Sequence, residues 1–295
     1  MPTYAFVTLD VFTDRRFGGN PLAVFPDARG LSDADMQALA AEFNLSETTF
    51  VLPPSDPANT ARVRIFNRTA EMPFAGHPNV GTGFVLAGQG RDRDGVLRFE
   101  ELAGLVEVRV ARDGSGLLVG AEIDAPQPLS LGAPLTPPQA AACAGIEVSD
   151  IVTAAHHPVQ ASVGVDFFLV QVSVEALSRA SPDMAAFRKV SGEVDRDGDR
   201  LSLFLYAPDG DIIRARMFAP LSGTFEDAAT GSASATLGAQ LLSLTSQADA
   251  RYEIVQGVEM GRPSRLRVRA RRAADGVRAS VGGGCVPVFS GEISL

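Results

Sequence analysis

Two segments of the chain, residues 76–86 and 231–241, carry no residue that is charged at neutral pH and consist of small, apolar and neutral polar residues. Each is long enough for about three helical turns. A helix without a charged face has no side that favours water, so the pattern predicts two buried helices. Gly83 and Gly238 lie in the middle of these helices, where glycine costs about 1 kcal/mol relative to alanine. We therefore expect the backbone of another element to approach each helix closely at its glycine.

Most other hydrophobic positions alternate with polar ones, as is typical of strands that bury one face. The alternation is clearest at residues 7–11, 63–65, 106–110, 170–174 and 266–268. Helical periodicity is rarer. Ser32 is placed to cap a helix that ends near Phe43, with Asp35 at its third position and an apolar face formed by Met36, Leu39, Ala40 and Phe43.

The two uncharged segments also resemble each other. They align without a gap, with identical residues at Glu71/Glu226, Gly76/Gly231, Gly83/Gly238 and Leu86/Leu241. Each follows an Arg-apolar-Phe strand end, and residues 24–36 resemble residues 172–184. The repeat predicts a duplicated fold whose active site lies where the halves meet. Each half contains strands, a surface helix and a buried helix, which indicates an α+β class with two pseudo-symmetric domains, each a curved sheet or barrel around its buried helix.

Proline-rich stretches at residues 125–128 and 134–138 are the natural linker between the halves. We therefore expect an N-terminal barrel domain at residues 1–124, completed by a C-terminal strand at 284–295. The second barrel domain then covers residues 125–283.

The amino-acid composition limits the kinds of molecule that the protein is expected to bind. The net charge is −9 and the isoelectric point is near 4.9, which argues against nucleic acid or an anionic membrane surface as a partner. Of the five arginines between residues 265 and 272, the first four alternate with apolar residues and indicate the solvent-facing side of a strand. Cys143 and Cys285 lack metal-ligand spacing, and reduced thiols fit a cytoplasmic protein. We find no signal-peptide pattern and no apolar run long enough to span a membrane.

The starts of the two predicted helices are candidates for ligand binding. Gly76 and Gly231 leave backbone N–H groups accessible just before each helix, and Pro78 suits a first helical turn. Two such ends in one cleft would bind a carboxylate, because free amides and the helix dipole both favour negative charge. The alternative is two ordinary core helices in which His77 and Ser232 serve as N-caps.

Glu47 is the first candidate for acid–base chemistry. It lies where a helix passes into a strand, among Leu45, Phe50 and Val51. A carboxyl in such an apolar wall is expected to have a raised pKa and to carry a proton near neutral pH. The alternative is an exposed acid at a strand end.

Further polar residues accompany the two helix starts. His77 opens the first uncharged helix, although a lone histidine is often structural. Asp227 lies in the loop before the second helix, and Glu71 and Glu226 fit the role of loop braces equally well.

No metal or cofactor motif emerges. His156 and His157 have no acid or thiol at ligand spacing. The acidic stretch 195–199 lacks the ligand periodicity of a calcium loop and indicates a turn. The sequence contains no P-loop, no dinucleotide fingerprint and no nucleophile elbow. We therefore expect chemistry with neither cofactor nor metal.

Several motifs together resemble the PhzF-like phenazine biosynthesis family. They are Asp10-Val-Phe-Thr with Gly19-Asn-Pro-Leu-Ala-Val, Asn44-Leu-Ser-Glu-Thr, Pro73-Phe-Ala-Gly-His-Pro, Glu226-Asp-Ala-Ala-Thr-Gly-Ser-Ala, Gln256-Gly-x-x-Met-Gly-Arg-Pro-Ser, Val281-Gly-Gly and Ser290-Gly-Glu. They occur in order over essentially the whole chain. The resemblance implies a diaminopimelate epimerase-like fold and an isomerase resembling trans-2,3-dihydro-3-hydroxyanthranilate isomerase, which acts by moving a proton. It also favours a homodimer.

By this resemblance Glu47 is the acid–base residue, and His77, Asp227 and Ser232 complete the site. Together with the argument from the helix starts, we expect His77 and Asp227 to take part in catalysis and Gly76, Thr230, Gly231 and Ser232 to bind the substrate. Racemases of this fold use two cysteines immediately before the equivalent glycines, where this chain has Ala75 and Thr230. That departure favours one-carboxylate chemistry on a small carboxylated metabolite. An epimerase or racemase, a hydrolase, or a non-catalytic small-molecule-binding or interaction protein are the alternatives. Ala228, where the family commonly has proline, is expected to loosen the second loop.

Overall fold

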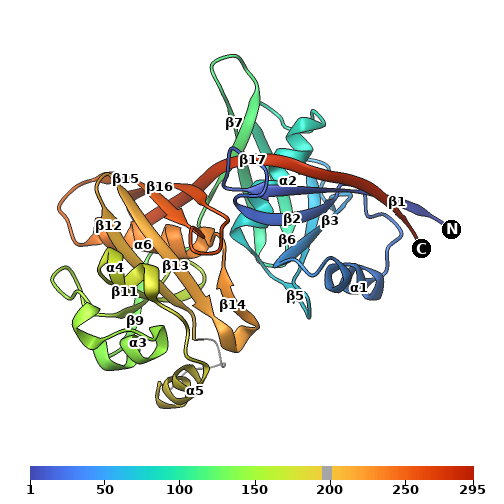
Figure 1. Ribbon diagram of the computed structural model, residues 1–295. Coiled ribbons are helices and arrows are strands. Elements are labelled where there is room, and N and C mark those ends of the chain that lie inside the picture. The colour runs from blue at the N-terminus through green and yellow to red at the C-terminus, as the bar shows by residue number, and fades with distance from the viewer. Residues whose placement is uncertain (195–200) are drawn as a thin grey trace. The chain divides into compact units, whose positions relative to one another are not determined.

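A computed structural model describes residues 1–194 and 201–295. The chain divides into two compact units, one formed by Met1–Asp124 with Gly282–Leu295 and the other by Ala125–Val281. The acidic stretch 195–199, interpreted above as a turn, lies outside the described residues. Figure 1 labels the elements along the chain.

Eight strands of the first unit close into a barrel. They are β1 (Thr3–Val11), β2 (Asn20–Phe25), β3 (Glu47–Leu52), β4 (Ala61–Phe66), β6 (Val96–Glu101), β7 (Gly104–Arg112), β8 (Leu118–Asp124) and the C-terminal part of β17 (Gly276–Ser294). Each pairs with the next in this order, and β17 returns to β1. The pairs β2/β3 and β4/β6 are parallel. A two-residue strand, β5 (Glu71–Met72), pairs with β4.

Helix α2 (Gly76–Gly88) lies inside this barrel and contacts β1, β2, β3, β7 and β8. Nearly all its residues are buried, as the missing charges predict. A Cβ at Gly83 would lie 2.5 Å from Val108 Cγ1 on β7. The close approach expected there exists, but the neighbour is a valine side chain and not backbone. Thr82 of the helix shares a 2.8 Å buried hydrogen bond with Thr49 of β3.

The opposite face of β3 packs against the surface helix α1 (Asp33–Phe43). Ser32 and Asp35 form a capping box, and the buried face of the helix includes Met36 and Leu39, both as predicted. Phe50 of β3 belongs to the same hydrophobic cluster as Met36 and Leu39. Alternate residues of β3 therefore face α1 on one side of the strand and α2 on the other. The strand is thereby fixed between an inner and an outer helix.

The second unit repeats this plan. Its strands are β9 (Ser130–Pro134), β10 (Val159–Ser162), β11 (Asp166–Gln171), β12 (Leu203–Asp209), β13 (Ile212–Ala219), β15 (Asp249–Gln256), β16 (Ser264–Ala273) and the start of β17. Consecutive members pair, with β11/β12 and β13/β15 parallel at the positions that β2/β3 and β4/β6 occupy in the first unit. Backbone bonds from Leu129 N to Val277 O (2.7 Å) and from Ala125 N to Ala279 O (2.9 Å) close the ring.

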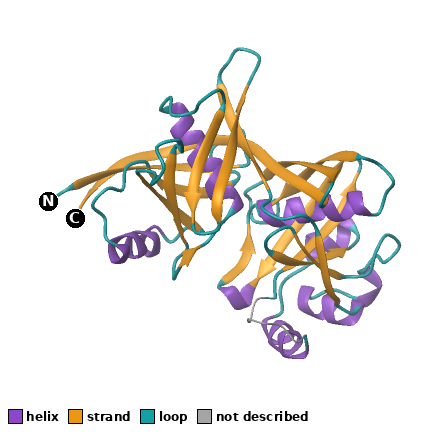
Figure 2. Ribbon diagram, turned by 180° about the vertical axis from the view of Figure 1, so that it is seen from behind, coloured by secondary structure: helices purple, strands orange, loops and turns teal. Residues whose placement is uncertain are grey.

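Helix α6 (Gly231–Ser243) fills the second barrel as α2 fills the first, and Figure 2 shows both helices among strands. A Cβ at Gly238 would collide with Val268 Cγ1 on β16, the strand equivalent to β7. The short strand β14 (Thr224–Asp227) pairs with β13 as β5 pairs with β4. The duplication predicted from the sequence is therefore confirmed element by element.

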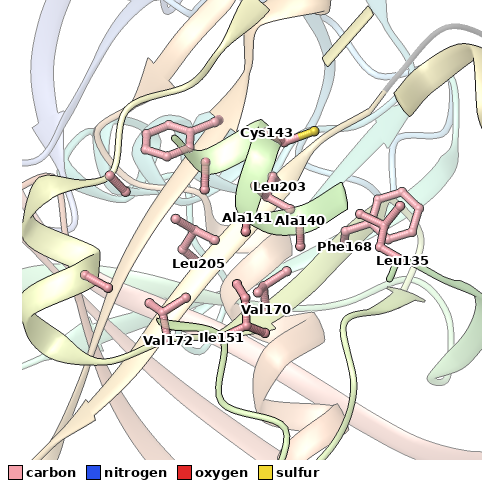
Figure 3. Close-up of a cluster of buried hydrophobic side chains, with 14 of the residues drawn as sticks. Leu135, Ala140, Ala141, Cys143, Ile151, Phe168, Val170, Val172, Leu203 and Leu205 are labelled. Carbon is pink, nitrogen blue, oxygen red and sulfur yellow. The ribbon is translucent and has the colours of Figure 1, made fainter. Parts of the chain in front are cut away.

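Additional helices cover the second barrel: α3 (Pro137–Ala144), α4 (Val174–Arg179) and α5 (Met184–Glu193), with short 3-10 turns η1 (Val148–Asp150) and η2 (Pro220–Ser222). They bury a hydrophobic cluster that includes Phe168, Val170 and Leu205 (Figure 3). The proline-rich stretch 134–138 was expected to be linker, and this is wrong. It ends β9 and begins α3, where Thr136 and Gln139 form a capping box.

The structure also bears on the expectations for the arginine-rich strand, the cysteines and membrane-spanning segments. Side chains of β16 alternate between buried and exposed, with Arg265, Arg267 and Arg269 on the exposed face as predicted. Cys143 and Cys285 are both free and buried. Among the helices described here, none combines the length and apolar character needed to cross a bilayer.

Candidate active site

The first group of predicted site residues gathers where β3 and α2 begin, and we call Glu47, Gly76 and His77 the N-terminal half-site. Glu47 is the first residue of β3 and pairs in register with Leu22 of β2. His77 is the second residue of α2. Glu47 Oε2 lies 3.4 Å from His77 Nε2, with side-chain exposures of 15% and 6%. The structure thus brings the predicted acid–base residue and the predicted histidine into contact.

Burial determines the protonation of His77. Desolvation lowers the pKa of its imidazole to about 3, only partly opposed by a hydrogen bond to the backbone of Pro21. Proline has no N–H, so the carbonyl must accept and the ring nitrogen facing it must carry the proton. Nε2 makes no other hydrogen bond within the described residues and presents a lone pair to Glu47. At neutral pH Glu47 Oε2 therefore faces a neutral imidazole.

Helix α2 starts without a side-chain cap. Its N-cap residue is Ala75, whose methyl group accepts nothing, and His77 lies inside the first turn. Asn79 Nδ2 donates to Ala75 O over 3.1 Å. The alternative in which His77 caps this helix is wrong. The first-turn amides are left to a ligand or solvent, which is the arrangement that favours an anion.

The second group of predicted residues lies around the start of α6, and we call Asp227, Thr230, Gly231 and Ser232 the C-terminal half-site. Thr230 is the N-cap residue, but its hydroxyl donates to Asp227 Oδ2 over 2.6 Å and does not cap the helix. Ser232 lies within the first turn and is not the N-cap either. Here too the helix start receives no side-chain cap, and Asp227 is fixed beside it.

Gln256, the last residue of β15, holds this second loop in place. Its Oε1 accepts from Thr230 N (3.0 Å), and its Nε2 donates to Asp227 O (2.8 Å) and to Thr230 Oγ1 (3.1 Å). Ser264 Oγ donates to Ala228 O over 2.9 Å. The motif running from Gln256 to Ser264 therefore positions the loop from both ends. These bonds restrain the backbone at Ala228 itself, where we expected looser structure.

Glu71 and Glu226 brace the two loops in the same way. Arg64 donates to both carboxylate oxygens of Glu71 (2.7 and 2.6 Å), and Arg216 does so to Glu226 (2.8 Å each). Each guanidinium also lies over the phenylalanine two residues later in its strand. The interpretation of both glutamates as loop braces is confirmed. They are structural members of the repeat.

Sequence reasoning missed Glu101, the last residue of β6. Both its carboxyl oxygens are buried, and desolvation raises its pKa to about 8. The repeat offers part of the information needed to find Glu101. It makes Arg64 equivalent to Arg216, and the pairing of the neighbouring strands then makes Glu101 equivalent to Gln256. His156 and His157 form no metal cluster with other residues that the structure describes, and His156 Nε2 lies 2.7 Å from the Tyr206 hydroxyl.

A barrel closed around an uncapped helix, present twice in one chain, defines the diaminopimelate epimerase-like α+β fold, and the chain is an isomerase of that class. More narrowly, it belongs to the PhzC-PhzF family of phenazine biosynthesis-like proteins, whose model matches residues 9–291.

Similar proteins cover the whole length of the chain. An uncharacterised isomerase of Mesorhizobium japonicum is 37% identical over 100% of both chains. Trans-2,3-dihydro-3-hydroxyanthranilate isomerase of Pseudomonas aeruginosa is 37% identical over 94% of each. The crystal structure of a PhzF-family phenazine biosynthesis protein of Bacillus anthracis is 25% identical, with a TM-score of 0.88 over 100% of both chains.

Proposed function

We propose that this protein is a cofactor-independent isomerase that moves a proton between carbons of a small carboxylated metabolite, with Glu47 as the proton carrier. The observation that carries the proposal is the 3.4 Å contact between Glu47 Oε2 and the unprotonated Nε2 of a buried, neutral His77. A neutral imidazole accepts a hydrogen bond from protonated Glu47 and cannot neutralise ionised Glu47. The pair is therefore suited to a carboxyl that alternates between its two forms.

The proposed reaction has two steps. In the first, ionised Glu47 removes a proton from an activated C–H, and the electron pair of that bond spreads over the adjacent double bonds of the substrate. In the second, the Glu47 carboxylic acid returns the proton to another carbon of the same conjugated system, on the same face. Atoms and charge balance without any further reactant. A single positioned acid–base group accounts for roughly 10²–10⁴-fold of the rate.

The remaining site residues are assigned to binding. Uncapped first turns at Gly76 and Gly231 offer amides to the substrate carboxylate, with Ser232 beside the second. Asp227, fixed by Thr230, orients a polar group of the substrate. We further propose that the protein acts as a cytoplasmic homodimer.

A racemase that uses two thiols is not supported by the residues that precede the two helices. The N-cap positions hold Ala75 and Thr230, and neither side chain exchanges a proton with carbon at neutral pH. The substrate of the Pseudomonas relative, trans-2,3-dihydro-3-hydroxyanthranilate, is a small carboxylated molecule of the proposed type. It is the first compound to test.

Isomerisation in deuterated water tests the proposal. Wild-type enzyme should produce isomer and exchange one substrate hydrogen, whereas Glu47→Gln should lose roughly 10²-fold or more of this turnover with little change in ligand affinity. Glu42→Gln, an exposed carboxylate on α1, is the matched control and should behave as wild type. Asp227→Asn should impair binding more than Glu47→Gln does. Near-normal turnover in Glu47→Gln would remove Glu47 from the mechanism.

A further inference from the structure

The outer face of strands β15 and β16 carries a row of exposed arginines (Figure 1). Side chains of β16 alternate, with Leu266 and Val268 buried on the side of α6 and the arginines between them exposed. Arg251 of β15 lies opposite Arg269 in the antiparallel register, so both side chains are on this outer face. We call this surface the arginine face, and its members are Arg251, Arg265, Arg267, Arg269 and Arg271.

The register of the two strands places like charges opposite each other. Arg251 pairs directly with Arg269. Side chains at such positions have Cβ atoms about 4.5–5.5 Å apart, and like charges there destabilise a sheet. An exposed position on a strand accepts many polar residues, so the fold itself does not require two arginines here. Their presence therefore has a cost in stability that folding does not explain.

The carboxylates on this face do not neutralise its arginines. Glu253 lies opposite Arg267 but forms its ion pair with Arg265. Asp249 lies opposite Arg271, and together with Glu253 it leaves the carboxylates outnumbered five to two. Within the described ranges 1–194 and 201–295, four arginines of this face form neither an ion pair nor a side-chain hydrogen bond; they are Arg251, Arg267, Arg269 and Arg271.

The first barrel shows the same face with its charges paired. Its strands β6 and β7 correspond to β15 and β16, and Arg98 of β6 forms a 2.9 Å ion pair with Glu107, directly opposite on β7. Arg109 is the counterpart of Arg269, since each follows the valine that meets the glycine of the core helix. It donates to two carboxylates of β8 over 2.8 and 2.9 Å. In the second barrel the neighbouring strand segment, residues 276–281, contains no acid.

The spacing of the arginines along β16 matches a row of carboxylates. Alternate residues of a strand are about 6.7 Å apart, and the same holds for alternate residues of any extended peptide. A guanidinium binds a carboxylate through two parallel hydrogen bonds, which makes arginine well suited to such a contact. Arg267, Arg269 and Arg271 can therefore each bind one carboxylate of an extended segment with an acid at every second position.

Two other anionic partners are disfavoured. A second copy of this chain, related by a twofold axis through this face, would bring arginines against arginines. Single-stranded nucleic acid is typically bound with aromatic side chains that stack on its bases. The aromatic residue of these two strands, Tyr252, lies on the opposite side of the sheet, where its ring approaches Gly238 of α6.

We propose that the arginine face is a docking surface for an extended acidic segment of another protein, which lies along β16 and carries carboxylates at alternate positions. The repulsion between Arg251 and Arg269 is then relieved in the complex, because each guanidinium gains an anionic partner. The chain as a whole has a net charge of −9, so the attraction is local. Screening at physiological ionic strength confines it to about 8 Å, and the segment has to make close contact.

Binding of synthetic peptides tests the proposal. The probe is a labelled ten-residue peptide in which glutamate and threonine alternate, measured by fluorescence anisotropy at low salt. The wild type should bind it, and should bind the glutamine–threonine peptide and an oligothymidylate of equal charge roughly tenfold or more weakly. Arg267→Gln with Arg269→Gln should weaken peptide binding roughly tenfold.

The first barrel supplies the matched control. Arg98→Gln with Arg109→Gln removes the same charge from the equivalent face, where both arginines are already paired, and should leave peptide binding at the wild-type level. Absence of binding, equal weakening by the two double variants, or tighter binding of the oligothymidylate would each overturn the proposal.

Thermal unfolding adds a readout that needs no partner. Arg251→Glu places a carboxylate opposite Arg269, so it should raise the Tm by about 1–3 °C while weakening binding of the glutamate–threonine peptide. Circular dichroism measures the Tm and shows whether the fold is retained. An unchanged or lower Tm in a folded Arg251→Glu variant would contradict the repulsion from which the proposal is argued.

Discussion

Replacing Glu101 by glutamine should change how the stability of the protein depends on pH. Burial raises the pKa of this carboxyl to about 8 in the folded protein, whereas in the unfolded chain it is near its ordinary value of 4.5. Between these values the folded state holds a proton that the unfolded state does not, so stability falls as the pH rises. The resulting loss between pH 5 and pH 7 is on the order of 2–3 kcal/mol. Below pH 4.5 the contribution is fully present.

Urea unfolding of the wild type and Glu101→Gln at several pH values isolates this effect, because the other titrating groups cancel in the difference. Circular dichroism is the suitable probe, since the chain has no tryptophan. Glu100→Gln is the matched control, because the contribution of Glu100 to stability depends on pH in the opposite direction. Hydrogen bonds from Asn59 and from the backbone of Asp56 and Ser55 lower the Glu100 pKa to about 2, so its contribution is lost as the pH falls. A wild-type minus Glu101→Gln difference that stays constant from pH 5 to pH 7 would refute the assignment of a neutral Glu101.

Two further predictions concern packing and the loop braces. Gly83→Ala should cost about 1–3 kcal/mol of unfolding free energy because the new methyl meets Val108, whereas Gly192→Ala, in an open part of a surface helix, should be neutral or stabilising by up to about 1 kcal/mol. Equal thermal shifts in the two variants would contradict the close approach. Arg216→Met should cost about 3–5 kcal/mol, because it leaves the largely buried Glu226 without its cation. Urea unfolding measures this loss, and adding Glu226→Leu should recover much of it; additive losses would contradict the brace.

Much of the fold could be predicted from the sequence, because the patterns that determine it are local and occur twice. The uncharged helices had to be buried, and the ungapped match of Gly76 to Gly231 showed that the constraint occurs twice. What periodicity could not provide was the strand order, since the parallel pairs arise from contacts between distant segments. Periodicity also could not show whether the element close to Gly83 approaches with its backbone or with a side chain, which is that of Val108.

The site was only partly accessible for the same reason. Glu47 and His77 are unusual residues in apolar surroundings, so each could be singled out, but their contact depends on the packing of β3 against α2. In the sequence, Glu101 resembles any other acid at the end of a strand. Its burial becomes apparent only when the barrel is closed. Gln256 belonged to a motif whose role became clear only when its hydrogen bonds to Thr230 and Asp227 were seen.

Single-turnover isomerisation in deuterated water tests whether Glu47 carries the proton. Trans-2,3-dihydro-3-hydroxyanthranilate is the first compound to test, and mass spectrometry of the starting compound and its product compares the wild type, Glu47→Gln and Glu42→Gln. We expect isomer formation with hydrogen exchange in the wild type and in Glu42→Gln, and a loss of roughly 10²-fold or more in Glu47→Gln at unchanged substrate affinity. Exchange and isomerisation at wild-type rates in Glu47→Gln would contradict the role of Glu47 as proton carrier.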